Sequence, residues 1–289
     1  MLLVTPTKRL QNYSLFFKLA NFFQKKCVLA FFYLFLYSFN PIFPPKTTSI
    51  LLIPSNCITL RSIKYNDSRA IVHCLSREAG RIPVIVSDGN SPAARRRRAL
   101  MLPGSSFSCV LDIRDNRSLQ SLRDIMPSRL MMLENPVATS VVLFICDFLA
   151  ALLRDSQPDA ALYDFVDRAI SHITSTSRSI ANSPIAFLIS LMQFMGIAPD
   201  TASWRQGYCF DFSAGLFRPS PPLHAQWLDA SQAAVLVSIS RMTLDNMHIF
   251  RLSRADRNAI LDLLLQYYST HFGSTSSLRS LAVVRSLFD

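Results

Sequence analysis

The apolar pattern of this sequence changes its period once, near Pro136, and that change limits what the chain can fold into. Before Pro136, apolar residues fall in runs of six to eight that are rich in β-branched residues and are separated by turn residues. Such runs are typical of strands. After Pro136, apolar residues recur at helical spacing over longer segments. Strands in one part and helices in the next predict an α+β chain.

Five strands are expected in the first part, within about 80 residues. They lie at 56–63, 69–76, 81–87, 106–114 and 118–126. In the second, Ala70, Val72 and Cys74 share one face, which is the alternation of a half-buried strand. A long irregular insertion separates the third strand from the fourth. This arrangement predicts a five-stranded OB-type barrel over residues 49–130.

An all-α domain is expected over residues 131–289. Pro136 begins its first helix, because proline suits a first helical turn. Ser253 and Asp256 are capping signals for a later helix, and Gly196 is a plausible C-terminal cap. The expected helices are 136–155, 159–173, 179–196, 229–242, 253–272 and 276–288. Residues 207–224 form an irregular stretch, since Pro221 and Pro222 continue neither helix nor sheet.

Residues 1–48 form an extension with an apolar segment at 27–39. As a helix this segment is about 20 Å long, short of the roughly 30 Å hydrocarbon core of a bilayer. No methionine follows Met1 until Met101, and our preferred explanation is a misassigned start. A membrane anchor and a cleaved signal remain alternatives.

Positive charge is confined to the first half of the chain. Residues 49–130 hold thirteen basic and six acidic residues, whereas residues 131–289 hold eleven basic and thirteen acidic ones. This asymmetry predicts a polyanion-binding module beside a near-neutral partner domain. The positive charge is densest at a run of four arginines in the long insertion. If the insertion is helical, one or two of these arginines must face the barrel. A solvated loop, an anionic membrane and an import receptor are the competing interpretations of this run.

Arginine suits phosphate, because its guanidinium pairs bidentately and also stacks on bases. Tyr65 and Phe107 are possible base-stacking residues, although aromatic residues in strands are more often core. The predicted DNA-binding residues are Arg61, Lys64, Arg69, Arg81, Arg95, Arg96, Arg97 and Arg98.

No enzyme, metal or cofactor site is predicted. The six cysteines contain no CxxC pair and are interpreted as reduced core thiols. The five histidines show no HExxH spacing, and no phosphate-binding GxxxxGK[ST] loop is present. Asp164 and Asp167 lie one helical turn apart and are expected to face solvent.

Residues 58–89 resemble the opening of the RecO family of bacterial DNA-repair recombination mediators. The resemblance continues through 210–222 and into the last helices, so that it spans roughly residues 55–288. The matching residues are Leu60, Arg61, Tyr65, Asp67, Gly80, Arg81, Leu278, Arg279 and Ser280. Many family members carry four zinc-binding cysteines near 204–224, where this chain has only Cys209, so it resembles the metal-free members. Residues 1–48 lie outside the resemblance.

The resemblance implies a non-enzymatic protein that binds single- and double-stranded DNA and anneals complementary strands. It also implies assistance in loading RecA onto DNA coated with single-strand DNA-binding protein, and RecR as a partner. The helical domain would receive the acidic C-terminal tail of single-strand DNA-binding protein. Candidate residues for this contact are Phe250, Arg251, Arg254 and Arg257.

A cytoplasmic, nucleoid-associated protein is expected from the same resemblance, with no membrane partner. The alternative is a membrane-tethered interaction protein that uses 27–39 as its anchor and the arginine run on anionic lipid.

Overall fold

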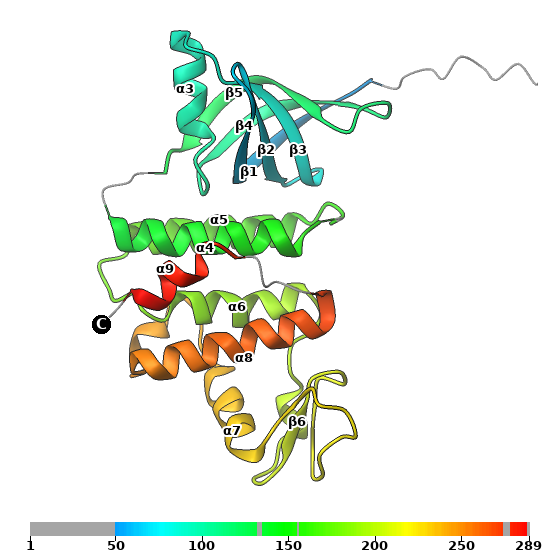
Figure 1. Cartoon of the computed structure of the whole chain (residues 1–289), viewed down its shortest axis with the longest axis vertical. Coiled ribbons are helices and arrows are strands. Elements are labelled where there is room, and N and C mark those ends of the chain that lie inside the picture. The colour runs from blue at the N-terminus through cyan, green and yellow to red at the C-terminus, as the bar shows by residue number, and fades with distance from the viewer. Residues whose placement is uncertain (1–49, 132–134, 155, 274–277, 288–289) are drawn as a thin grey trace, which may run out of the picture. The chain divides into compact units, whose positions relative to one another are not determined.

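Five strands close into a barrel in the order β1-β2-β3-β5-β4 (Figure 1). The computed structural model describes residues 50–131, 135–154, 156–273 and 278–287. The strands are β1 (Ile50–Asn66), β2 (Arg69–Ser76), β3 (Gly80–Ser87), β4 (Ser106–Arg114) and β5 (Gln120–Arg129). Neighbouring strands are antiparallel except β3 and β5, which pair in parallel. The predicted OB-type barrel is confirmed.

Alternation along the strands fills the barrel. Ala70, Val72 and Cys74 of β2 are buried inside it, as their predicted common face requires. On β3 the inward residues are Ile82, Val84 and Val86, each paired with a residue of β2. The intervening residues of both strands therefore face outward.

The first strand is longer than predicted, because it serves two neighbours in turn. Residues 50–58 pair with β4, and residues 57–66 pair with β2. A strand that changes partner along its length closes the barrel. Pro54 makes the first half of this strand hard to recognise in the sequence, because proline is rare inside strands. Its missing N–H is tolerated here, since residues 50–56 pair with β4 on one side only.

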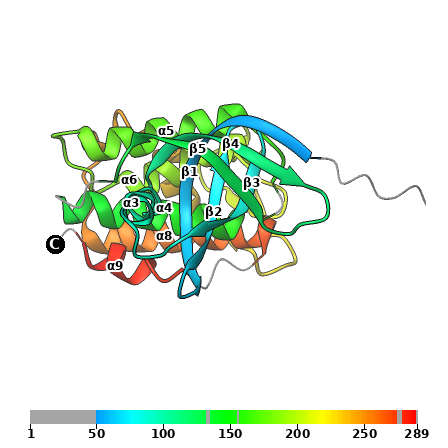
Figure 2. The same ribbon diagram turned by 90° about the horizontal axis from the view of Figure 1, so that it is seen from above.

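The long insertion between β3 and β4 contains helix α3 (Pro92–Leu100). Leu100 and the following Met101 are buried in the barrel core with Phe107. Figure 2 views α3 end-on beside the strands. Phe107 is therefore a core residue, and of the two aromatic residues considered for base stacking only Tyr65 is exposed.

The second part of the chain is built mainly from helices around one large apolar core. The helices are α4 (Pro136–Leu152), α5 (Ala160–Ser175), α6 (Ser183–Phe194), α7 (Ala230–Ile239), α8 (Arg254–Phe272) and α9 (Leu281–Ser286), with 3-10 turns η1 (Thr201–Ser203) and η2 (Met247–Ile249). Ser253 and Asp256, which were predicted as capping signals, form a capping box at the start of α8.

The stretch 207–224 is more regular than expected. Two of its segments, β6 (Cys209–Asp211) and β7 (Leu216–Arg218), form a small antiparallel sheet with β8 (Trp227–Leu228). Strands of two or three residues are too short to show any alternation in the sequence. The predicted fold class stands, with this sheet added to the helical part.

Two α5 carboxylates bind the barrel to the helices. Arg77 donates two hydrogen bonds to Asp164, at 2.9 and 3.0 Å. Arg129 forms an ion pair with Asp167 at 2.8 Å, although this contact lacks hydrogen-bond geometry. The expectation that Asp164 and Asp167 simply face solvent is therefore wrong, because each carboxylate engages a barrel arginine.

Apolar residues of the barrel also enter the helical core. Ile58, Leu60 and Leu75 are almost completely buried there, on the outer side of β1 and β2. Gly80 lies against the same region with a φ of +68°, and a Cβ at this position would be 2.5 Å from the Ser156 carbonyl oxygen. The close contact therefore requires glycine.

Within the described ranges, no helix combines the length and apolarity needed to cross a bilayer. The segment 27–39 and the rest of the expected extension lie outside these ranges.

Candidate nucleic-acid interface

The arginine run lies on α3, whose start is well defined. Ser91 is the N-cap, and its hydroxyl accepts a hydrogen bond from the Ala94 N–H at 3.2 Å. Pro92 occupies the first turn, where its fixed φ suits a helix. Arg97 and Arg98 lie in the last turn, where positive charge favours the helix dipole. The sequence of the run therefore stabilises the helix that displays it.

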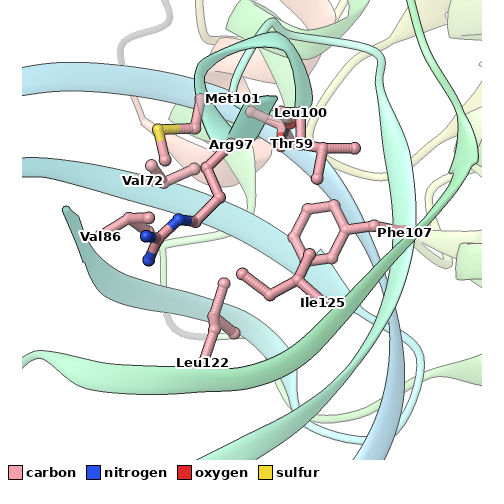
Figure 3. A pocket seen from close by; sticks show the side chains of 9 residues that line it. All are labelled: Thr59, Val72, Val86, Arg97, Leu100, Met101, Phe107, Leu122 and Ile125. Atoms are coloured by element: carbon pink, nitrogen blue, oxygen red, sulfur yellow. Dashed lines mark hydrogen bonds between the residues drawn. The ribbon is translucent and has the colours of Figure 1, made fainter. Parts of the chain in front are cut away.

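Helical geometry separates the four arginines into two pairs. Ala94 is fully buried against the barrel, and residues three and four positions later share its face. Those residues are Arg97, which reaches across the barrel mouth toward Val86 (Figure 3), and Arg98, whose Nε donates to Asp88 at 2.7 Å. Two of the four arginines face the barrel, as predicted for a helical insertion.

Arg95 and Arg96 point away from the barrel and are exposed. Across the described ranges, neither side chain forms an ion pair or a hydrogen bond within the protein. Two adjacent guanidinium groups are thus held on a capped helix without an internal counterion. This is the arrangement that an external polyanion would use.

The pocket beneath α3 is too small for a nucleotide. It is lined by the stem of Arg97 and by apolar side chains that include Phe107 and Ile125 (Figure 3). Its free volume is about 10 Å³, room for about one water molecule. A nucleic acid could therefore contact this end of the barrel only at its surface, because the pocket cannot hold a base.

The turn between β1 and β2 brings further cations beside α3. The Asp88 N–H donates to the Ser68 carbonyl at 2.7 Å, and Arg69 pairs with Ser87 across the sheet. Lys64 and Asp67 form an exposed ion pair at 3.1 Å. Such pairs contribute little to stability, so a phosphate could replace Asp67. Lys64, Arg69 and the α3 arginines therefore gather at one end of the barrel.

Arg61 and Arg81 lie elsewhere, on the outer face of β1, β2 and β3. Arg61 pairs opposite His73 and is exposed. Arg81 donates to the Arg154 carbonyl at 3.0 Å and lies 3.1 Å from Nδ1 of His73. Burial lowers the pKa of His73, and the positive charges of Arg81 and Arg61 lower it further. The eight predicted residues thus form two groups, and Arg81 also braces the barrel against the helices.

The turn between β4 and β5 adds basic residues outside the eight predicted ones. Asp112 is buried and is paired with Arg114, at 3.0 Å, and with Arg123. Hydrogen bonds from these two arginines lower the pKa of Asp112 to about 2. Arg117, in the turn itself, is exposed. In the sequence, Arg117 lies between Asn116 and Ser118. Both neighbours favour turns, and this position could have indicated an exposed arginine.

The candidate partner residues in the helical part have mixed surroundings. Phe250 is half-buried against the core, and its carbonyl accepts from Asn182 at 2.8 Å. Arg254 donates to the Arg285 carbonyl at 3.1 Å, and Arg257 donates to the Leu252 carbonyl at 2.7 Å. The first of these contacts positions the start of α8 against α9, and the second is local to the start of α8. Arg251 is exposed.

The residues near 204–224 do not fit a zinc site. The Cys209 thiol donates to the Arg218 carbonyl at 3.3 Å. Asp211 is buried and binds Arg218 at 3.3 Å and His224 at 3.2 Å. No group of three or more metal-ligating side chains occurs in the part of the chain that the structure describes. The buried Asp211 carboxylate instead joins β6 to β7 through its ion pair with Arg218.

Two family models match the chain, one on each part of the fold. The model for the recombination protein O N terminal matches residues 52–130, the barrel. The model for the recombination protein O C terminal matches residues 133–282, the helical part. Together they span nearly all of the described residues.

Three proteins named DNA repair protein RecO illustrate the similarity. The protein of Porphyromonas gingivalis is 32% identical over 250 residues, which are 83% of this chain and 100% of that protein. The protein of Phocaeicola vulgatus is 30% identical over 234 residues, 80% of this chain and 97% of that protein. The protein of Azobacteroides pseudotrichonymphae is 26% identical over 241 residues, again 83% of this chain and 100% of that protein. With both family models matched in order on the barrel and the helices, the chain belongs to the RecO family.

Proposed function

We propose that this protein is a DNA-binding recombination mediator in DNA repair and that its barrel binds single- and double-stranded DNA. One observation carries the proposal: Arg95 and Arg96 stand exposed, without an internal counterion among the described residues, on a helix docked to an OB-type barrel. Membership of the RecO family supports the same conclusion.

The mechanism requires no bond to be made or broken. Guanidinium groups neutralise phosphates and release condensed counterions, so binding tolerates any sequence and weakens steeply with salt. Annealing needs two strands held close while their mutual repulsion is screened. Arg95, Arg96 and the neighbouring Arg69 supply fixed positive charge for that purpose. The proposal therefore includes no catalytic residue and no cofactor.

The partners expected from the family are part of the proposal. They are RecR, the C-terminal tail of single-strand DNA-binding protein and, indirectly, RecA. An acidic tail would suit exposed cations beside apolar surface, and Arg251 next to Phe250 offers such an edge. The proposed location is the cytoplasm, at the nucleoid, where these partners would meet DNA.

A salt titration of oligonucleotide binding tests the proposal. The variant R95A/R96A should weaken binding to single- and double-stranded oligonucleotides alike. Its salt slope on duplex DNA should fall by about 2, because about one counterion is released per lost phosphate contact. The control R178A/R241A removes the same charge from exposed positions of the helical part and should retain the wild-type slope. Equal slopes for R95A/R96A and the control would refute the assignment to α3.

A further inference from the structure

The outward face of β1, β2 and β3 carries a row of three isoleucines. Ile63 pairs with Ile71 across the β1–β2 ladder, and Ile71 pairs with Ile85 across the β2–β3 ladder. Because the alternate residues of β2 and β3 fill the barrel core, these three side chains project to the outside. Ile63 is 41% exposed, and Ile71 and Ile85 are partly exposed. The three strands lie side by side in Figure 1.

Cations border this isoleucine row on both sides. Two residues along the strands toward the helices, Arg61 pairs with His73. Two residues in the other direction, Arg69 pairs with Asn66 and Ser87. The residue after Ser87 is Asp88, which accepts a hydrogen bond from Arg98 of α3. Each border is about 7 Å from the row, the length of two strand residues. An apolar strip about one side chain wide thus runs between positively charged margins.

The chemistry of this face matches an unstacked nucleic-acid strand. Bases present flat apolar surfaces that side chains can pack against, and their backbone supplies an anion at every nucleotide. A duplex keeps its bases stacked inside and offers only phosphates to a flat protein surface. A strip of isoleucines adds nothing to duplex binding, but it covers bases that are exposed in a single strand.

We propose that the isoleucine row binds the bases of single-stranded DNA, while Arg95 and Arg96 bind phosphates of single and double strands alike. This inference rests on the proposed DNA-binding function and divides it between two surfaces. Contacts with exposed bases would make the barrel bind a single strand more tightly than a duplex. A strand held there lies beside the α3 arginines, which can screen the phosphates of an approaching complementary strand.

The test compares base-bearing and abasic oligonucleotides of equal length, because both carry the same phosphates. Wild-type protein should bind the base-bearing single strand about tenfold more tightly than the abasic one. The variant I63T/I71T/I85T keeps β-branched side chains and should lose most of that difference. Its affinity for duplex DNA and its salt slope should stay at wild-type values. The conservative variant I63V/I71V/I85V should retain the base preference.

Two results would overturn the inference. One is a wild-type protein that binds abasic and base-bearing single strands equally, a measurement that needs no variant. The other is a folded threonine variant that keeps the base preference. That result would refute the inference even if the variant lost binding to an acidic peptide, because the row would then bind a protein partner. Failure of the proposed function is distinguishable, since then R95A/R96A would leave duplex binding unchanged.

Discussion

Adjacent arginines of one run have different surroundings because a helix turns by about 100° per residue. Arg97 and Arg98 share the face of the buried Ala94 and contact the barrel, whereas Arg95 and Arg96 do not. The sequence indicates the presence of the charge and, given a helix, the number of arginines that must face inward. It does not indicate which ones, since that depends on which residues the barrel mouth buries.

Gly80 should be among the least replaceable residues of the barrel. An alanine there would adopt a left-handed conformation and would place its Cβ 2.5 Å from the Ser156 carbonyl oxygen. We expect G80A to lower the free energy of unfolding by about 3 kcal/mol, measured by urea denaturation.

Two other glycines separate the causes of that loss. Gly207 has a φ of +86° but open space around it, and Gly89 has neither restriction. G207A should therefore cost about 1 kcal/mol, and G89A should cost less than about 0.5 kcal/mol. If G80A cost no more than G207A, the close contact with Ser156 would contribute nothing.

Asp112 should make stability depend on pH in the acid range. Its pKa in the folded protein is lowered to about 2 by Arg114 and Arg123, below the value of about 3.9 expected for an unfolded chain. Its stabilising contribution is therefore complete above about pH 4 and is lost as the pH falls through about 2. The difference in unfolding free energy between wild type and D112N should shrink over that interval. A difference that stays constant from pH 5 to pH 2 would contradict this role.

At the scale of elements, the N-cap of α3 links helix stability to DNA binding. S91A removes the acceptor of the Ala94 N–H and should lower the free energy of unfolding by about 1 kcal/mol. Because Arg95 and Arg96 lie in the first turns of this helix, fraying should also weaken DNA binding, measured by fluorescence anisotropy. S91T retains the hydroxyl and is the matched control. Normal DNA affinity in a destabilised S91A protein would show that α3 need not be intact at its start.

Strands and helices with a clear period could be predicted from the sequence, and those without one could not. The alternation in 69–76 predicted β2 correctly, and Ser253 with Asp256 marked the start of α8. The first half of β1 was missed because Pro54 obscures a strand that pairs there on one side only. Strands β6, β7 and β8 are set by tertiary contacts, such as the binding of Asp211 by Arg218, which leave no local pattern.

The candidate site was predictable in its chemistry and less so in its geometry. A count of charges predicts a basic barrel, but not that Arg81 contacts Arg154 or that Lys64 is paired with Asp67. The isoleucine row requires the register of β1 and β3 against β2. The sequence alone does not fix that register, because it depends on the turns between the strands and on the irregularities in the β1–β2 ladder.

At the scale of the whole molecule, the barrel and the helices should unfold together. Ile58, Leu60 and Leu75 lie on the barrel strands but are buried in the helical core, and Asp164 and Asp167 add two ion pairs. Apolar burial across a junction makes the stability of one part depend on the other.

Two probes can follow the two parts separately in urea. Trp204 and Trp227 are the two tryptophans of the chain, and both lie in the helical part, so their fluorescence reports the helices. Binding of a labelled oligonucleotide reports the barrel. In the wild-type protein the two signals should be lost at the same urea concentration.

The variant L60A/L75A should separate the two transitions. Each truncation removes a side chain that is at most 2% exposed and should cost about 2–4 kcal/mol, chiefly at the junction. DNA binding should then be lost at lower urea than tryptophan fluorescence, because the barrel has the smaller core of its own. The control V235A truncates an exposed side chain of α7 and should leave the signals coincident. Coincident transitions in L60A/L75A would show that these two leucines do not couple the unfolding of the barrel to that of the helices. The ion pairs of Asp164 and Asp167 would then be the next contacts to remove.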